Sequence, residues 1–288
     1  IMIFNGTILI TGGTGSFGKA FAKYLLKKNY FKKIIIFSRD ELKQHEMSKR
    51  FSEQKYKCLR YFLGDVRDKD RVFDALKGVD YLVHAAALKQ VPRAEYNPFE
   101  YIKTNIIGAQ NLIEGCIHNN VKKVVALSTD KASNPINLYG ATKLVSDKLF
   151  IAANLYTNER VSTKFASVRY GNVMGSRGSV IPYFLSIASS GELKITDSRM
   201  TRFMIPLEAA IELIWHAFND MNGGEIYIKK IPSMNILDIA KAVSESAKHK
   251  IIGIRPGENI HEQMVGVEDA PFTYEYKGYY KILPEIFH

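Results

Sequence analysis

The sequence predicts an α/β fold built on a doubly wound parallel sheet, and three features indicate it. Apolar, β-branched segments of strand length alternate with amphipathic segments of helix length from residue 7 to about residue 170. A glycine-rich loop joins the first predicted strand to the first predicted helix. Small or polar residues follow five of the strands, at the edge of the sheet where such folds bind ligands. Together these features are typical of a Rossmann-like, dinucleotide-binding arrangement.

The first strand is predicted for Thr7 to Thr11, and the loop after it reads GGTGSFG. In this spacing Gly12 allows a tight turn, Gly15 lets the backbone approach a pyrophosphate, and Gly18 lets the helix pack closely. The helix predicted from about Ser16 would offer its first N–H groups to phosphate. A purely structural turn explains one glycine well but not three, so the loop predicts a dinucleotide site.

The second strand is predicted for Lys33 to Phe37, and Arg39 follows it closely. An acidic residue at this place usually binds the ribose 2′-hydroxyl of NAD. Arg39 and Lys43 instead favour the 2′-phosphate of NADP, because both can form charge-assisted hydrogen bonds to phosphate. Asp40 leaves an alternative open, since it could bind a ribose hydroxyl or cap the helix that begins after it.

The third strand is predicted for Leu59 to Leu63, and Asp65 after it could accept a hydrogen bond from adenine or cap the following helix. The fourth is predicted for Val79 to His84 and is followed by three alanines, which leave room for a cofactor. His84 is interpreted as a satisfied strand-end histidine, not a base. Lys89 could reach phosphate or substrate, or could simply be solvated.

Later segments continue the alternation and then depart from it. Asn105, within a long predicted helix, is expected to bond backbone groups of the facing helix. After about residue 175 the alternation weakens, and a smaller region interleaved with the first is expected. The remaining predictions are helices at Pro98–Asn119, Pro182–Ser190, Leu207–Asn219 and Ile236–Ser246, and strands at Val121–Leu127 and Lys164–Arg169.

The segment STDKASNPINLYGATK carries the residues that point most directly to chemistry. Tyr139 and Lys143 are four apart, so near the start of a helix they share one face. An ammonium beside a phenol favours the phenolate, which can then take a proton from a sugar or alcohol hydroxyl while a hydride leaves the same carbon. This pair alone is a weak signal; its position after a buried strand and downstream of the glycine loop strengthens it.

The length and composition are those of an ordinary soluble globular chain. The chain is long enough for one large α/β domain, or for a nucleotide domain and a smaller appendage. Of the 288 residues, 46% are apolar and 24% are charged. No apolar run approaches the roughly 20 residues of a membrane helix, and the first residues pass straight into a strand. Neither a membrane span nor a signal peptide is therefore expected.

Cysteine, histidine and charge narrow the function classes further. Cys58 and Cys116 are far apart and are expected to be reduced thiols, which suits the cytoplasm. The seven histidines show no paired metal spacing, so no metal is expected. The net charge of +11 suits polyanionic small molecules, or simply a basic soluble surface. Nucleic acid ranks lowest among the partners, because Lys and Arg are spread along the chain.

The chain carries, in order, the motifs GGTGSFG, SRDELK, GDVRD, AAALK, STDK, YGATK, RYGNV, GSRGSV, MTRF and RPGE. Together they resemble the extended short-chain dehydrogenase/reductase superfamily and, within it, the inverting UDP-N-acetylglucosamine 4,6-dehydratases. The resemblance covers nearly the whole chain. GGEIYIKKIPSM and IIGIRPGENIHE look most like the branch that opens pseudaminic acid synthesis, and L-fucosamine-type capsule enzymes are the nearest rivals. The chain stops before the family's usual carboxyl end, so a terminal piece is expected to be missing.

The resemblance implies roles for the residues of the central segment. Tyr139 matches the base that removes the 4-hydroxyl proton while NADP takes the C4 hydride, and Lys143 matches the lysine that holds the ribose and lowers the tyrosine pKa. Lys131 matches the C5 base and Asp130 the acid at the 6-hydroxyl, with Thr129 in the same catalytic motif. A retaining relative would carry Asp-Glu here, so Lys131 points to inversion at C5. The implied product is a UDP-2-acetamido-2,6-dideoxy-β-L-arabino-hex-4-ulose.

The same matching implies which residues bind NADP and which bind UDP-N-acetylglucosamine. Arg202 and Arg255 suit a diphosphate, although surface salt bridging is the alternative for each. Glu258 suits the uridine ribose, and Asn259 stands where the family often has lysine. The NADP set comprises Gly12, Thr14, Gly15, Ser16, Phe17, Gly18, Ser38, Arg39, Asp40, Glu41, Leu42, Lys43, Asp65, Val66, Ala86, Lys89, Tyr139, Lys143 and Val173. The UDP-sugar set comprises Lys89, Asn172, Val180, Thr196, Met200, Arg202, Arg255 and Glu258.

The expected organisation is an NADP-binding domain over residues 1–175, with returning segments from later in the chain, and a mainly substrate-binding region over 176–288. A homo-oligomer is expected, with hexamers among the options. Three alternatives stay open: a nucleotide-sugar 4-epimerase, which needs Tyr139 and Lys143 but no acid–base pair; a capsule-pathway 4,6-dehydratase/5-epimerase; and a non-catalytic NADP-sensing protein, which commonly loses the Tyr or the Lys.

Overall fold

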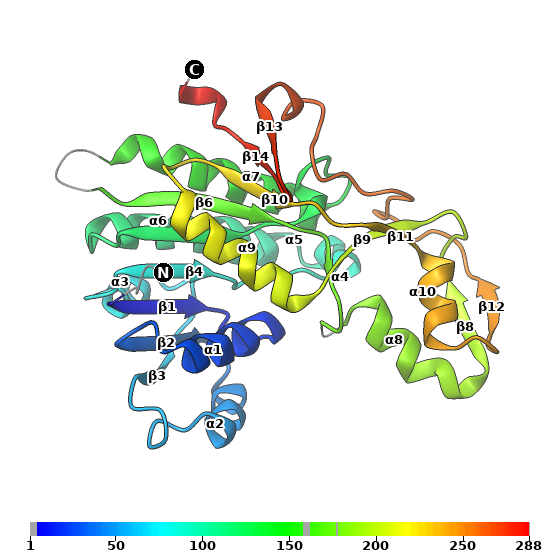
Figure 1. The fold of residues 1–288 in the computed structure, drawn as a ribbon, viewed down its shortest axis with the longest axis horizontal. Helices are drawn as coiled ribbons and strands as arrows, with labels where there is room; N and C mark the ends of the chain where they lie inside the picture. Colours follow the sequence, from blue (N-terminus) through cyan, green and yellow to red (C-terminus); the bar gives the residue numbers. More distant parts are fainter. Residues whose placement is uncertain (1–4, 158–161, 177, 288) are drawn as a thin grey trace.

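The computed structural model describes residues 5–157, 162–176 and 178–287. Its centre is a nine-stranded sheet in the order β13-β14-β10-β6-β5-β4-β1-β2-β3 (Figure 1). The seven strands from β10 to β3 are parallel to their neighbours, and β14 and β13 add an antiparallel edge. The bounds are β1 Thr7–Thr11, β2 Lys33–Ser38, β3 Leu59–Leu63, β4 Tyr81–His84, β5 Lys123–Leu127, β6 Lys164–Arg169, β10 Ile226–Lys229, β13 Thr273–Tyr276 and β14 Tyr279–Ile282.

The register of this sheet brings the loops after several strands to one edge. Thr11, the last residue of β1, is paired with Phe37 near the end of β2 and with His84 at the end of β4. His84 is in turn paired with Ala126 near the end of β5. The glycine loop, the alanines after β4 and the polar cluster after β5 therefore leave the sheet side by side, as the alternation predicted.

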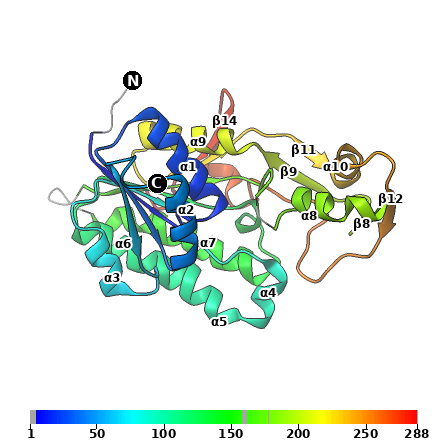
Figure 2. The same cartoon turned by 90° about the horizontal axis from the view of Figure 1, so that it is seen from below.

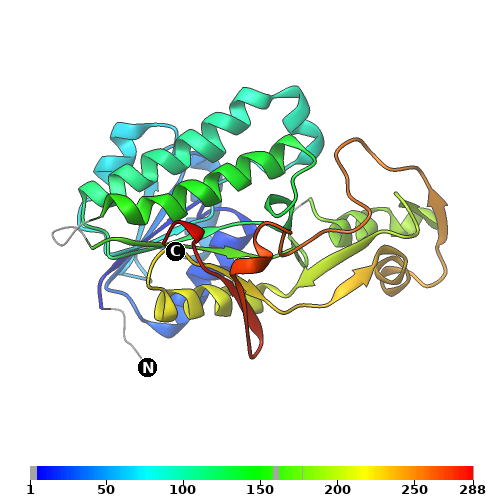
Figure 3. The same ribbon diagram turned by 90° about the horizontal axis from the view of Figure 1, so that it is seen from above.

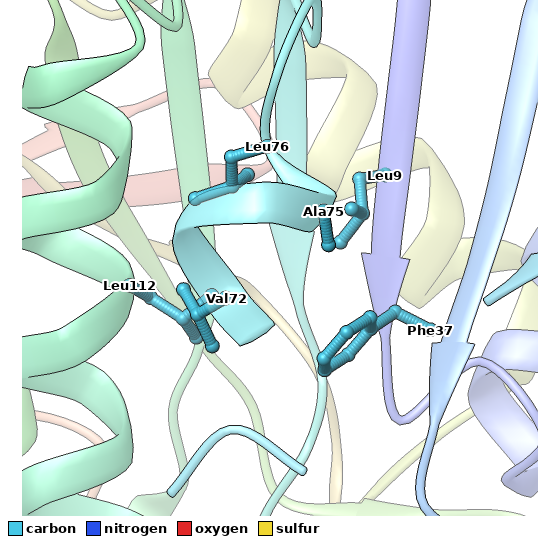
Figure 4. Close-up of a pocket in the computed structure, with 6 residues that line it drawn as sticks. All are labelled: Leu9, Phe37, Val72, Ala75, Leu76 and Leu112. Atoms are coloured by element: carbon cyan, nitrogen blue, oxygen red, sulfur yellow. The ribbon is translucent and has the colours of Figure 1, made fainter. Parts of the chain in front are cut away.

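Helices cover both faces of the sheet (Figure 2). One apolar cluster packs α1 (Ser16–Lys28), α2 (Glu41–Arg50) and α9 (Leu207–Asp220) on the sheet through residues such as Phe21, Met47 and Trp215. A second packs α3 (Lys69–Ala75), α6 (Gly108–His118) and α7 (Leu138–Ala152) on the other face. Part of this second core is shown in Figure 4, where side chains of β1, β2, α3 and α6 meet: Leu9, Phe37, Val72, Ala75, Leu76 and Leu112.

A smaller lobe with its own core follows β6 in the chain (Figure 1). Its centre is apolar and includes Phe184, Leu193 and Ile239. A three-stranded sheet in the order β11-β9-β7 joins it to the main sheet's edge, and β8 pairs in parallel with β12. The bounds are β7 Asn172–Val173, α8 Val180–Ile187, β8 Glu192–Ile195, β9 Thr201–Ile205, β11 Ser233–Asn235, α10 Ile236–Val243 and β12 Lys248–Ile251.

Most predicted elements are confirmed, and the differences have local causes. The fourth strand begins at Tyr81, two residues later than predicted. Asp80, just before it, bonds its neighbours outside the strand ladder: its carboxylate accepts from the Thr7 N–H, its own N–H donates to the Thr7 carbonyl, and its carbonyl accepts from the Lys122 N–H. The long predicted helix is divided into α5 (Pro98–Tyr101), a π-helical segment (Ile102–Ile107) and α6, after the short α4 (Val91–Tyr96). Returning segments were expected in the main domain, but the strands β10, β14 and β13 that form them were not predicted, and neither were the small strands after residue 170.

Asn105 lies in the π-helical segment and corrects one prediction. Its amide accepts from the Leu88 backbone N–H and donates to the Leu88 carbonyl, both at 2.9 Å, and donates to the Thr142 hydroxyl at 3.0 Å. The backbone that it bonds is thus the loop after β4, and only a side chain of the facing helix is involved. Asn105 ties that loop to α7, close to Lys143.

Two helix caps show the structural role of residues for which the sequence left alternatives open. Asp40 caps α2, since its carboxylate accepts from the Lys43 N–H at 2.9 Å. Asp68, and not Asp65, caps α3, accepting from the Arg71 N–H at 3.0 Å. Asp65 therefore does not cap α3, which was the alternative role predicted for it.

Candidate active site

The glycine loop after β1 has the close approaches that its spacing predicted. Gly12 has a φ of +62°, and a Cβ there would lie 2.8 Å from the Ala86 backbone nitrogen. A Cβ on Gly18 would lie 2.5 Å from the Gly13 backbone, so α1 packs directly on the loop. Gly15 caps α1 without any side chain, and the first turn of α1 has no acidic residue. The first N–H groups of this helix therefore suit an anion.

The residues after β2 include two basic side chains, each beside a carboxylate. The Arg39 side chain is 53% exposed and its Nη1 lies 3.6 Å from an Asp65 oxygen. Lys43 pairs with Asp40 at 2.6 Å. Hydrogen bonds from Arg67 and its charge hold the pKa of Asp65 below its usual range despite partial burial. The Arg39 guanidinium thus lies at the end of the sheet with its donors available to solvent.

His84 at the end of β4 was predicted to be a satisfied strand-end histidine, and only one of its ring nitrogens is satisfied: Nδ1 bonds the Thr11 hydroxyl at 2.8 Å, while Nε2 is buried with no hydrogen-bond partner in the described residues. The Thr11 hydroxyl also accepts from the Ala85 and Ala86 N–H groups at 3.1 and 3.2 Å. Burial lowers the pKa of His84 to about 3, with a smaller effect from Lys143. A neutral imidazole fixed this way shapes the loop and does not act as a base near neutral pH.

A single 3₁₀ turn after β5 (Asp130–Ala132) carries the predicted acid and base. The Thr129 hydroxyl donates to Asp130 Oδ1 at 3.0 Å, and Lys131 Nζ donates to the same oxygen at 3.1 Å. Asp130 is 1% exposed, and its Oδ2 has no hydrogen-bond partner in the described part of the chain. A buried carboxylate with one unpartnered oxygen has a hydrogen-bonding position left for a ligand.

Helix α7 packs its first turn against this 3₁₀ turn. Asn137 caps the helix by accepting from the Gly140 N–H at 2.8 Å. A Cβ on Gly140 would lie 2.3 Å from the Lys131 carbonyl oxygen, so only glycine allows this contact. The contact explains the glycine within YGATK, and it brings Tyr139 to the strand end where Thr129 lies.

The environment of Tyr139 corrects the predicted direction of its pKa. Burial raises the pKa of the phenol, and the charges of Asp130 and Asp147 raise it further. A hydrogen bond from Thr129 opposes them. Lys143 is itself buried, which lowers its pKa, and Asp147 partly offsets that effect. Desolvation therefore outweighs the neighbouring ammonium in this structure.

Asp147, one turn beyond Lys143, belongs to a buried network that the sequence did not reveal. It accepts from the Ser128 hydroxyl at 2.6 Å and pairs with Arg169 at 3.4 Å. Arg169, 1% exposed, also pairs with Asp269 at 3.0 Å. This network holds β5, β6 and α7 to the returning C-terminal segment. Only spatial contact reveals it, because its members are far apart in sequence.

The predicted UDP-sugar residues come from the loop after β4, from β7, from the small lobe and from the segment that follows it in the chain. Asn172 Oδ1 and Glu258 Oε2 are buried and lack hydrogen-bond partners in the described residues. Arg202 is 8% exposed, and its Nη1 donates to the Thr201 and Ile260 carbonyls. Arg255 pairs with Glu258 at 2.5 Å, so the salt-bridge alternative holds for this arginine here.

The other predicted ligand residues vary in exposure. Met200 is 3% exposed and packs in the small lobe's core, and Val180 packs against the same cluster. Thr196 is half-buried, and Lys89 is exposed although crowding around its amine lowers its pKa. Thr14, Ser38 and Val66 are buried, Phe17, Ala86 and Val173 are half-buried, and Ser16, Glu41 and Leu42 are exposed. Arg177 of GSRGSV lies outside the described residues.

Glu262 joins the site although sequence analysis missed it. Its carboxylate lies 3.2 Å from Lys131 Nζ, and it accepts from Asn259 at 3.2 Å. The neighbouring Gly257 carbonyl accepts from Asn137 at 2.8 Å, which brings the whole segment to the cap of α7. Glu262 lies two residues beyond a backbone contact to β9, and tertiary folding sets this position. The spacing of residues in the sequence alone therefore does not reveal that Glu262 belongs to the site.

The described residues hold no metal cluster, no disulfide and no membrane-spanning helix. Within residues 5–157, 162–176 and 178–287, no group of three His, Cys, Asp or Glu side chains is arranged to hold a metal ion. Cys58 and Cys116 are both free thiols. None of the helices in the described ranges is long and apolar enough to cross a membrane.

The doubly wound sheet, the glycine loop and the Tyr-Lys helix define a protein of the short-chain dehydrogenase/reductase class. Within that class the chain belongs to the polysaccharide biosynthesis protein family, whose model matches residues 8–284. It is 58% identical to an inverting UDP-N-acetylglucosamine 4,6-dehydratase of Campylobacter jejuni, over 99% of this chain and 85% of the relative. The resemblance predicted from the motifs is thereby confirmed.

Two further comparisons place the chain among related proteins. It is 45% identical to a UDP-glucose 4-epimerase of Rickettsia akari, over 98% of this chain and 84% of the relative. The solved structure of Pen from Bacillus thuringiensis superposes with a TM-score of 0.93 at 39% identity, covering 99% of this chain and 92% of that one. The predicted α/β fold is therefore confirmed, including the smaller lobe.

Proposed function

We propose that this protein is an inverting UDP-N-acetylglucosamine 4,6-dehydratase that uses NADP. The observation that carries the proposal is the buried turn after β5, where Asp130 and Lys131 share one hydrogen bond at 3.1 Å beside Tyr139. Elimination of water needs an acid and a base close together, and these two side chains supply both. The relative of the same activity, 58% identical along the chain, supports the choice of reaction and substrate.

The residues after β1 and β2 fit a dinucleotide. A side chain on Gly12 would fill the space beside Ala86, and α1 begins without a capping side chain. These are the features that a pyrophosphate needs, and Arg39 suits a 2′-phosphate. When bound, the nicotinamide supplies the acceptor for a hydride from C4 and the donor of that hydride to C6.

The protein's own side chains would move the protons. Tyr139 takes the proton of the 4-hydroxyl, although burial raises the pKa of its phenol in this structure. The resulting 4-ketone acidifies C5–H, and Lys131 takes that proton. Asp130 gives a proton to the 6-hydroxyl, which leaves as water. A proton from solvent then reaches C5 on the opposite face, which inverts this centre. The two protons taken by Tyr139 and Lys131 are released, one to restore Asp130 and one to solvent.

A 4-epimerase is the second candidate, because relatives 45% identical to this chain carry that name. An epimerase needs Tyr139 and Lys143 but has no use for an acid and a base at C5 and C6. Asp130 and Lys131, buried together, favour the dehydratase. The finer expectations form part of the same proposal: a place in pseudaminic acid synthesis, a cytoplasmic setting and a homo-oligomeric assembly.

Incubation with UDP-N-acetylglucosamine tests the proposed function. The expected product is lighter than the substrate by one water and carries a 4-keto group and a C6 methyl, both visible by mass spectrometry and NMR. Recovery of the 4-epimer alone, with no loss of water, would refute the dehydratase and support the second candidate.

Arg39 provides a test of the cofactor. The Arg39→Ala variant is expected to weaken NADP much more than NAD, because the 2′-phosphate loses a charge-assisted partner worth about 1.5–3 kcal/mol. Binding of each cofactor is measured by fluorescence or calorimetry at one ionic strength. Arg60→Ala, which removes an arginine from β3, is the matched control. Equal weakening of both cofactors would contradict the assignment of the 2′-phosphate.

A further inference from the structure

The segment 255–269 leaves the small lobe, crosses to the main domain and reaches the active site (Figure 3). Backbone contacts fix its path. The Ile260 carbonyl accepts from the Thr201 N–H at 3.0 Å, and the Met264 carbonyl accepts from Arg169 at 3.1 Å. His261 Nδ1 also bonds the Thr201 hydroxyl at 2.8 Å. Glu262 lies between these contacts, so the backbone on both sides of it is held in place.

Glu262 faces inward from this segment. Its side chain is 3% exposed, one oxygen lies 3.2 Å from Lys131 Nζ, and the other accepts from Asn259. Burying a carboxylate is costly unless it is paired and hydrogen-bonded, and here both conditions are met. The amine of Lys131 is therefore shared by two carboxylates that come from different parts of the chain, Asp130 beside it and Glu262 from the returning segment.

Lys131 has a structural need for such a partner. Its side chain is a flexible stem of four carbons on a three-residue turn. The side chain is 20% exposed. A lysine stem loses considerable rotamer entropy when it is held in one direction, so a single neighbour on its own turn leaves its direction weakly defined. A base that must approach one ring carbon from one face requires a defined direction, and misplacement by about 1 Å can cost roughly 100-fold in rate.

We propose that Glu262 is a positioning residue for Lys131: its carboxylate holds the amine in the direction required for proton abstraction at C5. The inference rests on the proposed function and deepens it, because it assigns a role to a side chain outside the strand-end motif. It also links the segment that carries Arg255 and Glu258 to the base, so residues of the substrate region fix the geometry of the proton transfer.

The Glu262→Gln variant tests this role because it keeps the shape of the side chain and removes its charge. Wild type and variant are compared with UDP-N-acetylglucosamine in D₂O. Exchange at C5 is followed by NMR, and hydride transfer from C4 by cofactor absorbance. We expect C5 exchange to slow about 10- to 100-fold while the C4 step and the substrate KM stay within about twofold. Glu268→Gln, the same change at an exposed site of the same segment, should match wild type.

Two outcomes would overturn the proposal. Wild-type exchange in Glu262→Gln would show that its charge does not position the base, since amide and carboxylate have the same shape. Equal losses in the C4 and C5 steps would show that Glu262 acts on substrate binding instead. Thermal unfolding of Lys131→Met, Glu262→Gln and the double variant tests the pair without catalysis: non-additive shifts are expected. If wild type shows no C5 exchange, the proposed function is wrong. The unfolding measurements on the single and double variants then still test whether Lys131 and Glu262 are paired.

Discussion

Replacing Lys131 by alanine is expected to abolish exchange of the C5 hydrogen with solvent deuterium, while partial hydride transfer from C4 survives. The amine lies beside Asp130 at 3.1 Å and Glu262 at 3.2 Å, on a turn at the end of β5. Removal of a general base typically costs about 10²- to 10⁴-fold, and no other amine on this turn can replace it. The measurement is NMR of the sugar in D₂O, together with cofactor absorbance in a single turnover.

The control for this variant is Lys148→Ala, which removes an exposed lysine from α7. It should leave both steps at the wild-type rate. Since Lys131→Ala leaves two buried carboxylates without their amine, thermal unfolding of the variant should be measured beside its activity. Loss of C4 hydride transfer together with C5 exchange, in a folded variant, would require another role for Lys131.

Replacing Tyr139 by phenylalanine is expected to stop the reaction at its first step. The phenol is the predicted base for the 4-hydroxyl, and its hydrogen bond with Thr129 places it at the strand end. Hydride transfer from C4, C5 exchange and turnover should therefore all fall about 10²- to 10⁴-fold together. Stopped-flow absorbance of the cofactor on mixing with UDP-N-acetylglucosamine measures the first of these directly.

Tyr101→Phe is the matched control, because Tyr101 is a buried phenol in the same apolar cluster and donates to the Gln90 carbonyl at 2.7 Å. This variant should lose some stability but retain hydride transfer. Normal cofactor reduction in Tyr139→Phe would mean that another group takes the 4-hydroxyl proton. Together with the Lys131 variant, this pair separates the oxidation at C4 from the elimination across C5 and C6.

The main sheet could be predicted from sequence because its signals are local. Thr7–Thr11, Leu59–Leu63 and Lys164–Arg169 are apolar runs bounded by turn residues, and their bounds match the observed strands. The returning strands β13 and β14 carry tyrosines and the charged residues Glu275 and Lys281, and they gain their pairing only from each other and from the sheet that they join. Such elements are fixed by tertiary contact, which a local pattern does not contain.

The candidate site likewise has one part that local sequence signals predict and another that only tertiary contacts define. Asp130, Lys131 and Tyr139 lie in one short stretch, so sequence could place them together at a strand end. Glu262 reaches Lys131 from 131 positions away, and Arg169 joins carboxylates of two other elements. The pKa of Tyr139 could not be predicted from its neighbour Lys143 either, because burial is the larger effect. Burial depends on how α7 packs, and the sequence pattern does not give it.

The stereochemistry at C5 tests the central claim most directly. UDP-N-acetylglucosamine is converted in D₂O, and the product is read by NMR before slow exchange sets in. If Lys131 takes the C5 proton and Asp130 assists departure of the 6-hydroxyl, C5 should carry deuterium in the inverted configuration, while the C6 methyl, which receives its hydrogen from C4, should carry none. A 4-keto product with the substrate's configuration at C5, or with C5 unlabelled, would contradict this account.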